Sequence, residues 1–257
     1  MDLQLEGRHA LVCGGSKGIG GAIAKSLSNE GARLTIVARN AEELANHLGE
    51  LSGQGHQYLA VDMSQPEDIQ RLLGYLKKDP MEIVVNNTGG PPPGPIVEAG
   101  LEEFQKALEM HLFVSHQIMQ TVLPHMKQQN YGRFINVIST SVKIPIHGLG
   151  VSNTTRGAMA SWAKTLSNEV AAYGITVNNI LPGAVSTTRL DAIIENGAKK
   201  KGVTKEESAQ SMMNTIPAGR FGRPEELGDL AAFLASSRAA YITGVSIPVD
   251  GGRTGSL

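Results

Sequence analysis

Residues 13–20 read Cys13-Gly14-Gly15-Ser16-Lys17-Gly18-Ile19-Gly20 and directly follow the apolar, β-branched run Ala10–Val12. Glycines at 14, 18 and 20 let a backbone turn sharply, approach a ligand closely and pack a helix on a strand. A helix predicted over 20–29 begins at this turn, so its N-terminus would face an anion. The stretch predicts a strand–turn–helix unit that cradles a dinucleotide pyrophosphate. An ordinary glycine-rich turn is the alternative.

The remainder of the chain alternates short β-branched runs with longer amphipathic stretches. This alternation is typical of a parallel sheet covered by helices on both faces. We expect an α/β protein with one Rossmann-type, doubly wound parallel sheet of about seven strands, forming a single domain over residues 1–257. The predicted strands are 10–13, 33–38, 58–61, 83–85, 134–138, 176–180 and 245–249. The predicted helices include 20–29, 101–127, 155–172 and 224–236. The Pro/Gly-rich segment 89–95 follows a strand directly and predicts a rigid loop over a site.

Composition excludes several functional classes. The net charge is −1, so no global attraction to nucleic acid or anionic membrane is expected. Cys13 is the only cysteine, and no cluster of histidines and carboxylates has metal-ligand spacing, so neither a disulfide nor a metal site is predicted. The N-terminus lacks the features of a signal peptide, and no apolar run approaches the ~18 residues that span a bilayer. We expect a cytoplasmic protein.

The Gly-x-x-x-Gly-x-Gly spacing resembles that of the short-chain dehydrogenase/reductase superfamily, and the resemblance extends over nearly the whole chain. Asn86–Gly89 resembles the family's Asn-Asn-Ala-Gly turn, and Pro182–Thr187 resembles the loop that hydrogen-bonds the nicotinamide amide. Asp62 matches the acidic residue that meets the adenine. Ile216–Glu226 and Val249–Gly252 resemble C-terminal motifs of the bacterial 3-oxoacyl-carrier-protein reductase branch.

The resemblance implies a dinucleotide site. An enzyme specific for NAD places a carboxylate at the end of the second strand, where this chain reads Ala38-Arg39-Asn40. Lys17 in the glycine turn can reach the same place, and two cations suit a 2′-phosphate, so we predict NADP(H). Alternatively, Arg39 is only a solvated residue at a strand end. The expected cofactor-binding residues are Gly14, Ser16, Lys17, Gly18, Ile19, Gly20, Arg39, Asp62, Met63, Asn87, Gly89, Arg156, Pro182, Gly183, Val185 and Thr187.

The expected catalytic positions depart from the family pattern. In the family a Tyr donates the proton, a Lys four residues later lowers its pKa, a Ser steadies the carbonyl oxygen and an Asn orders water. Here Ser139 matches the Ser, whereas Ser152, Arg156 and His111 stand at the Tyr, Lys and Asn positions. A Ser hydroxyl is far less acidic than a phenol, whose pKa is near ~10, and Arg keeps its proton. The positive charge is therefore retained, but the acid is not.

His111 is a candidate replacement acid, since histidine titrates near neutral pH. The alternative is a helix residue that hydrogen-bonds backbone. Lys143 and His147 follow Ser139 in a loop that lines the substrate pocket in the family, although an ordinary loop role is favoured for both. Residues 188–215 occupy the place of the family's variable substrate lid, whose Met, Ile and Lys content admits an acyl chain or an anionic group. Within it, Lys199–Lys201 predicts a solvated helix end.

We therefore expect an NADP(H)-dependent oxidoreductase that interconverts a carbonyl and an alcohol. Its substrate would be a small molecule, and an acyl thioester is one candidate. The resemblance implies a homotetramer or homodimer built on the 101–127 and 155–172 helices and the last strand. Two alternatives stay open. One is a non-redox NADP-binding sensor or scaffold, and the other is lyase or epimerase chemistry in the same pocket.

Overall fold

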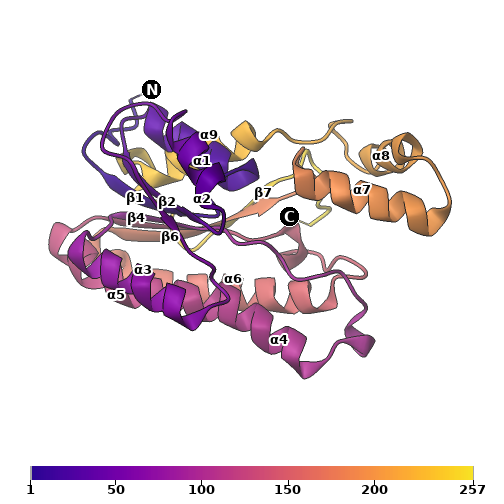
Figure 1. Ribbon diagram of the computed structural model, residues 1–257, viewed down its shortest axis with the longest axis horizontal. Helices are drawn as coiled ribbons and strands as arrows, with labels where there is room; N and C mark the ends of the chain where they lie inside the picture. The colour runs from indigo at the N-terminus through magenta and orange to yellow at the C-terminus, as the bar shows by residue number, and fades with distance from the viewer. Residues whose placement is uncertain (1, 257) are drawn as a thin grey trace.

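The computed structural model describes residues 2–256 and contains one seven-stranded, entirely parallel sheet (Figure 1). The strand order is β3-β2-β1-β4-β5-β6-β7, so the direction of winding reverses between β1 and β4. The doubly wound Rossmann-type sheet predicted from the sequence is confirmed. The strands are β1 (His9–Cys13), β2 (Arg33–Ala38), β3 (Gln57–Ala60), β4 (Ile83–Asn86), β5 (Gly132–Val137), β6 (Ile175–Pro182) and β7 (Ser246–Val249).

Helices cover both faces of this sheet (Figure 1). On one face lie α1 (Gly18–Asn29), α2 (Ala41–Leu48) and α9 (Pro224–Ala235), and on the other lie α3 (Pro66–Lys78), α5 (Val114–Gln129) and α6 (Gly150–Val170). Successive strand residues enter opposite cores: Ala10 and Val12 pack toward α1, whereas Leu11 and Cys13 pack toward α3 and α5. Because both faces of the sheet are buried, residues 10–13 of β1 are all apolar, instead of alternating between apolar and polar.

The segment between β6 and α9 forms two helices, α7 (Thr188–Lys201) and α8 (Lys205–Met213), which stand beyond one end of the sheet (Figure 1). Lys199–Lys201 form the exposed last turn of α7, as predicted. Within residues 2–256 none of the helices is both long enough and apolar enough to cross a membrane.

Two predicted helices differ from those observed. The 101–127 helix is divided into α4 (Leu101–Leu108) and α5 by a π-helical turn, Glu109–Phe113, and such wide turns are frequent at functional sites. The 155–172 helix starts earlier, at Gly150, and ends at Val170, so Ser152, which precedes the predicted helix, lies in the first turn of the observed one. The first position of α6 favours glycine, because a Cβ at Gly150 would lie 2.5 Å from Ile96 Cβ. Other boundaries shift by one or two residues, as helix and strand ends commonly do.

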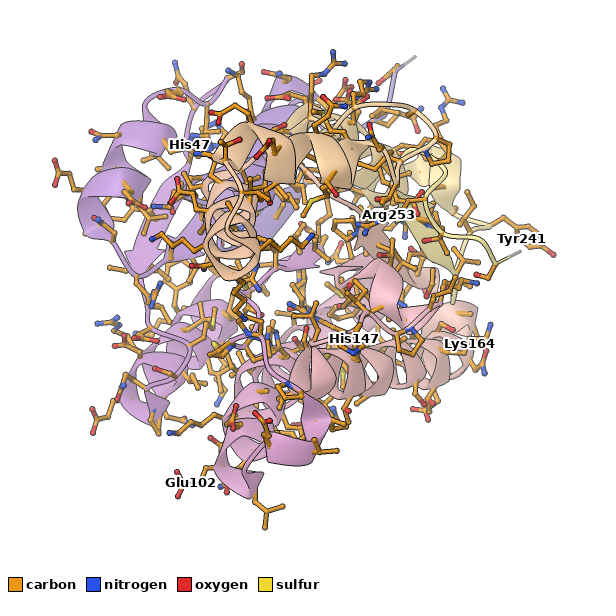
Figure 2. All side chains as sticks on the ribbon, turned by 90° about the vertical axis from the view of Figure 1, so that its right-hand side faces the viewer. His47, Glu102, His147, Lys164, Tyr241 and Arg253 are labelled. Atoms are coloured by element: carbon orange, nitrogen blue, oxygen red, sulfur yellow. The ribbon has the colours of Figure 1, made fainter. Side chains whose placement is uncertain are left out.

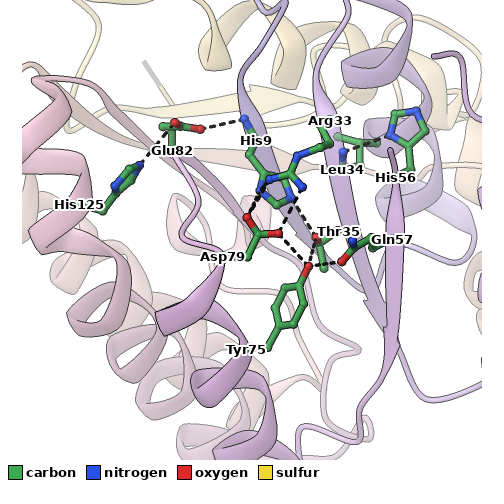
Figure 3. A network of polar contacts seen from close by, with 10 residues as sticks. All are labelled: His9, Arg33, Leu34, Thr35, His56, Gln57, Tyr75, Asp79, Glu82 and His125. Carbon is green, nitrogen blue, oxygen red and sulfur yellow. Dashed lines mark hydrogen bonds and ion pairs between the residues drawn. The ribbon is translucent and has the colours of Figure 1, made fainter. Parts of the chain in front are cut away.

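A polar network lies at the amino-terminal ends of β1 and β2, whereas the glycine turn follows the carboxyl end of β1 (Figure 3). Arg33 Nη2 donates to Asp79 Oδ1 at 2.8 Å and to His9 Nδ1 at 2.6 Å, and His9 Nε2 lies 3.0 Å from Thr35 Oγ1. Burial, followed by the charge of Arg33, lowers the pKa of His9 to about 4. The network joins α3 to the sheet through uncharged His9, so we assign it to stability rather than to function.

Candidate active site

The glycine turn is built around Asn87. Gly14 and Gly18 have φ values of +62° and +59°, a region that favours glycine. A Cβ at Gly20 would lie 2.1 Å from the Gly14 carbonyl oxygen and 2.6 Å from Asn87 Nδ2. Asn87 Nδ2 donates to the Cys13 and Gly14 carbonyls at 3.3 and 3.4 Å, which ties the end of β4 to the turn. The N-terminus of α1 is thereby held beside the β1–β4 switch point, where ligands bind in such sheets.

A cavity of about 370 Å³ lies beside the first turns of α1. It is lined by Lys17 and Gly18, by residues 186–188, and by residues of α1, α2 and α9 that include Lys25, His47 and Pro224. Thr187 Cγ2 lies 3.5 Å from the point that a Gly18 Cβ would occupy. Thr187 also caps α7, since its Oγ1 accepts from Leu190 N at 3.3 Å. Gly183 N donates to Val249 O at 3.0 Å and anchors the same loop to β7. The glycine turn and the Pro182–Thr187 loop therefore face each other at Gly18 and Thr187.

The expected 2′-phosphate position also contains a carboxylate that sequence reasoning missed. Lys17 Nζ lies 2.8 Å from Glu43 Oε1, and Ser16 Oγ donates to Glu43 Oε2 at 3.3 Å. The hydrogen bond from Lys17 is the main cause of a lowered Glu43 pKa, and Arg39 adds to it. A sequence pattern that could have predicted this carboxylate is the helix start Asn40-Ala41-Glu42-Glu43. Asn40 caps α2 by accepting hydrogen bonds from Glu42 N and Glu43 N, which places both acidic residues in the first turn.

Asp62 and Met63 follow β3 as half-buried residues. The Asp62 carboxylate accepts from Ser64 N at 2.9 Å and from Ser64 Oγ at 2.8 Å. These two bonds lower the pKa of Asp62, with a smaller contribution from Arg39. Arg39 is therefore close enough to act electrostatically on both Asp62 and Glu43.

The four expected catalytic residues stand on elements that pack together. Ser139 follows β5 and begins a 3-10 turn, Thr140–Val142, with its Oγ accepting from Ser141 N at 3.1 Å. Ser152 and Arg156 lie one turn apart on α6 and are both buried. The 3-10 turn and the π-helical turn that carries His111 both pack against α6.

Thr88 connects His111 to Arg156. The Thr88 hydroxyl is hydrogen-bonded to His111 Nδ1, and its carbonyl oxygen accepts from Arg156 Nη2 at 3.5 Å. Arg156 Nη1 donates to Val137 O at 3.3 Å, so the guanidinium lies between the ends of β4 and β5. Burial, and then the charge of Arg189, lowers the pKa of Arg156 to about 10, which leaves it charged at neutral pH.

His111 is 2% exposed, and its Nε2 is buried with no hydrogen-bond partner. Burial is the largest cause that lowers its pKa to about 3, followed by the charges of Arg156 and Arg189. The imidazole is therefore uncharged near neutral pH. A neutral imidazole can still donate a hydrogen bond, but it is not the strong acid that an imidazolium would be.

Arg189 was not recognised in the sequence because it lies inside the variable segment, with no motif around it. The structure brings Arg189 Nη1 within 3.3 Å of the Gly90 carbonyl oxygen, beside Arg156. By contrast, Lys143 and His147 are exposed loop residues, and Figure 2 shows His147 at the surface on the side of α7 and α8.

A second missed feature is a row of buried asparagines across the sheet. Asn86 Nδ2 donates to Asn136 Oδ1 at 2.8 Å, Asn136 Nδ2 donates to Asn179 Oδ1 at 2.9 Å, and Asn179 Nδ2 donates to Ser246 Oγ at 3.0 Å. These residues are register partners on β4, β5, β6 and β7. Each asparagine satisfies its neighbour, so the row ties four adjacent strands together across the sheet. Over residues 2–256 no group of three or more His, Cys, Asp or Glu side chains is placed to hold a metal ion.

An all-parallel Rossmann-type sheet with a glycine turn at its switch point is an architecture typical of nucleotide-binding proteins. Residues 14–254 match the family model described as enoyl-(acyl carrier protein) reductase. The chain therefore belongs to the short-chain dehydrogenase/reductase family of NAD(P)-dependent oxidoreductases, and the family resemblance found in the sequence is confirmed.

The relatives cover essentially the whole chain. The chain is 32% identical to the 3-oxoacyl-acyl-carrier-protein reductase of Vibrio cholerae over 252 residues, which are 97% of this chain and 98% of the relative. It is also 32% identical to a D-beta-hydroxybutyrate dehydrogenase of Cupriavidus necator, covering 96% of this chain and 98% of that protein. Among solved structures, an L-sorbose reductase of Gluconobacter frateurii complexed with NADPH and L-sorbose is similar with a TM-score of 0.93, 32% identity and full coverage of both chains.

Proposed function

We propose that this protein is an NADP(H)-dependent reductase that interconverts a carbonyl and an alcohol through Ser139, Ser152, Arg156 and His111. The observation that carries the proposal is the position of Arg156. A buried, charged guanidinium lies between the ends of β4 and β5, in contact with Thr88 O and Val137 O, where the family's Lys would hold the nicotinamide ribose. Arg156 has donors left over for ribose hydroxyls after these two contacts.

The preference for NADP(H) over NAD(H) rests on Lys17 and Arg39. Lys17 is exposed and held only by a surface ion pair with Glu43, which contributes little to stability. A bound 2′-phosphate carries more charge than Glu43 and would draw Lys17 to itself, next to Arg39. The relative that was solved with NADPH agrees with this assignment. The remaining cofactor contacts follow the expected set, from the glycine turn through Asn87 and Gly89 to the Pro182–Thr187 loop.

When bound, NADPH would supply the hydride for the carbonyl carbon. Negative charge then develops on the carbonyl oxygen. The Ser139 and Ser152 hydroxyls donate hydrogen bonds to that oxygen, and Arg156 stabilises its charge electrostatically. His111 acts as a neutral donor through Nε2, with Thr88 donating to Nδ1 and thereby fixing the tautomer. The oxygen takes its proton from water, because none of these side chains is an acid near neutral pH.

The test is NADPH oxidation with an acetoacetyl thioester and activated ketones. It compares wild type, His111→Ala and the double variant Ser152→Tyr with Arg156→Lys. Turnover by wild type supports the reductase. A large loss in His111→Ala would place His111 among the groups that stabilise the oxygen, whereas unchanged turnover would remove it from the mechanism. The same preparations, examined by cross-linking or light scattering, test the homotetramer that we propose by family resemblance.

A second candidate function is a non-redox NADP(H)-binding protein. The observation that favours it is the missing acid: Ser152 replaces the phenol, and the pKa of His111 is lowered to about 3. This candidate predicts NADPH binding by wild type with no oxidation of any ketone. It also predicts that only the double variant Ser152→Tyr with Arg156→Lys oxidises NADPH, which would overturn the reductase proposal for the native protein.

A further inference from the structure

Two arginines from distant parts of the chain meet at Gly90. A methyl group on Gly90 would lie 2.9 Å from Arg189 Nη2 and 3.6 Å from Arg156 Nη2. Arg156 is 7% exposed and comes from α6, whereas Arg189 is exposed and comes from the first turn of α7. Gly90 leaves the space between the two guanidinium groups free of a side chain.

The positive charge of this pair is not balanced by the protein. Within residues 2–256 no carboxylate forms an ion pair with Arg156 or Arg189, and both bind only backbone carbonyls. Asp191, the acidic residue nearest to Arg189 in sequence, lies 4.0 Å from Lys205 instead. The unpartnered Nε2 of His111 lies in the same neighbourhood. Arg156 is the buried member of the pair, and burying a cation without a counter-charge is unfavourable, so an anion bound beside it would be stabilised.

We propose that Arg189 and Arg156 bind a carboxylate carried by the substrate, so that the substrate class is oxo acids and their hydroxy-acid products. The inference rests on the proposed reductase function. Guanidinium forks match a planar carboxylate with two parallel hydrogen bonds. The cofactor pyrophosphate does not fill this role, because it belongs at the N-terminus of α1, where Thr187 faces Gly18. Arg189 lies beyond Thr187 in the chain and contacts Gly90, on the side of Arg156 and His111.

The kinetic test compares each acid with its neutral methyl ester, using 2-oxobutyrate and acetoacetate. We expect wild type to prefer the acids, with kcat/KM at least about tenfold above that for the esters. Arg189→Gln removes the preference by lowering kcat/KM for the acids at least about tenfold more than for the esters. Arg189→Lys keeps part of it, since it keeps the charge but not the fork. Lys200→Gln, which removes an exposed charge from the far end of α7, is the matched control and behaves as wild type.

The proposal is overturned if wild type shows no preference for acid over ester, or if Arg189→Gln changes both equally. It is also overturned if Arg189→Gln weakens NADPH binding and leaves the acid-to-ester ratio as it was, because Arg189 would then bind the cofactor. A calorimetric titration of NADP⁺-loaded protein with malonate and malonamide needs no turnover. Malonate binding that disappears in Arg189→Gln supports the carboxylate site even if every ketone is inert and the reductase function fails. The absence of malonate binding to wild type overturns the site.

Discussion

Two buried histidines make the stability of this protein depend on pH in a way that single substitutions can isolate. His9 is 4% exposed and His111 is 2% exposed, and their pKa values are lowered from 6.5 to about 4 and about 3, respectively, chiefly by burial. We predict that His111→Asn and His9→Asn each reduce the loss of stability that occurs on acidification.

The sign and size follow from proton linkage. Well above pH 6.5 neither the folded nor the unfolded state holds the proton, so the two groups do not contribute to the pH dependence of stability there. Below pH 6.5 the unfolded chain takes up protons that the folded chain does not, and each histidine lowers the free energy of unfolding by about 1.4 kcal/mol per pH unit. This decline ends near the folded-state pKa. Between about pH 7.5 and pH 5.0 each histidine therefore lowers stability by about 2 kcal/mol.

The assay is urea unfolding of the cofactor-free protein at both pH values and at one protein concentration, since assembly would otherwise alter the apparent stability. The quantity compared is the change in unfolding free energy between the two pH values, so a constant loss caused by the substitution itself cancels. We expect each variant to lose about 2 kcal/mol less than wild type on acidification. A variant at the exposed His147 should lose as much as wild type.

The reasoning about His111 would be refuted if His111→Asn and wild type lost equal stability between the two pH values. That result would mean that the folded protein admits a proton on His111 at mildly acidic pH. The imidazolium would then again be available as a catalytic acid. A direct NMR titration of the His111 ring in the folded protein would locate its pKa.

Three further predictions concern the cofactor turn, the phosphate position and the asparagine row. Gly20→Ala should lower the melting temperature and weaken NADPH binding at least about tenfold in fluorescence titrations, because its Cβ would lie 2.1 Å from Gly14 O. The control is Gly74→Ala, at a position on α3 where a Cβ meets nothing within 4 Å, and it should leave stability unchanged or raise it. Arg39→Ala should reduce the ratio of kcat/KM for NADPH to that for NADH by about tenfold with little change for NADH, and an unchanged ratio would assign the 2′-phosphate elsewhere. Asn136→Ala should cost about 2–4 kcal/mol in urea unfolding by leaving Asn86 and Asn179 without their partners, whereas the exposed Asn46→Ala should stay within about 0.5 kcal/mol of wild type.

The fold could be read from the sequence because its determinants are local and periodic. Apolar β-branched runs mark strands that are buried on both faces, and the glycines at 14 and 20 occupy places where a Cβ would collide with Gly14 O or Asn87. The start of α6 was predicted too late because Gly150 disfavours a helix locally. Its place in the structure depends on a tertiary contact, the close packing of Gly150 against Ile96. The π-helical turn at His111 likewise had no signal in the helical periodicity.

The sequence by itself determined the parallel sheet, the glycine turn and the absence of the Tyr and Lys at positions 152 and 156. Each of these depends on residue identity and on spacing along the chain. Only the tertiary structure decided how the remaining groups act. The charge state of His111 depends on burial and on two arginines, and the meeting of Arg156 with Arg189 depends on how α6 and α7 are placed around Gly90. Such effects arise from distances in space between residues far apart in sequence, and electrostatic energies depend on those distances and on exclusion of water.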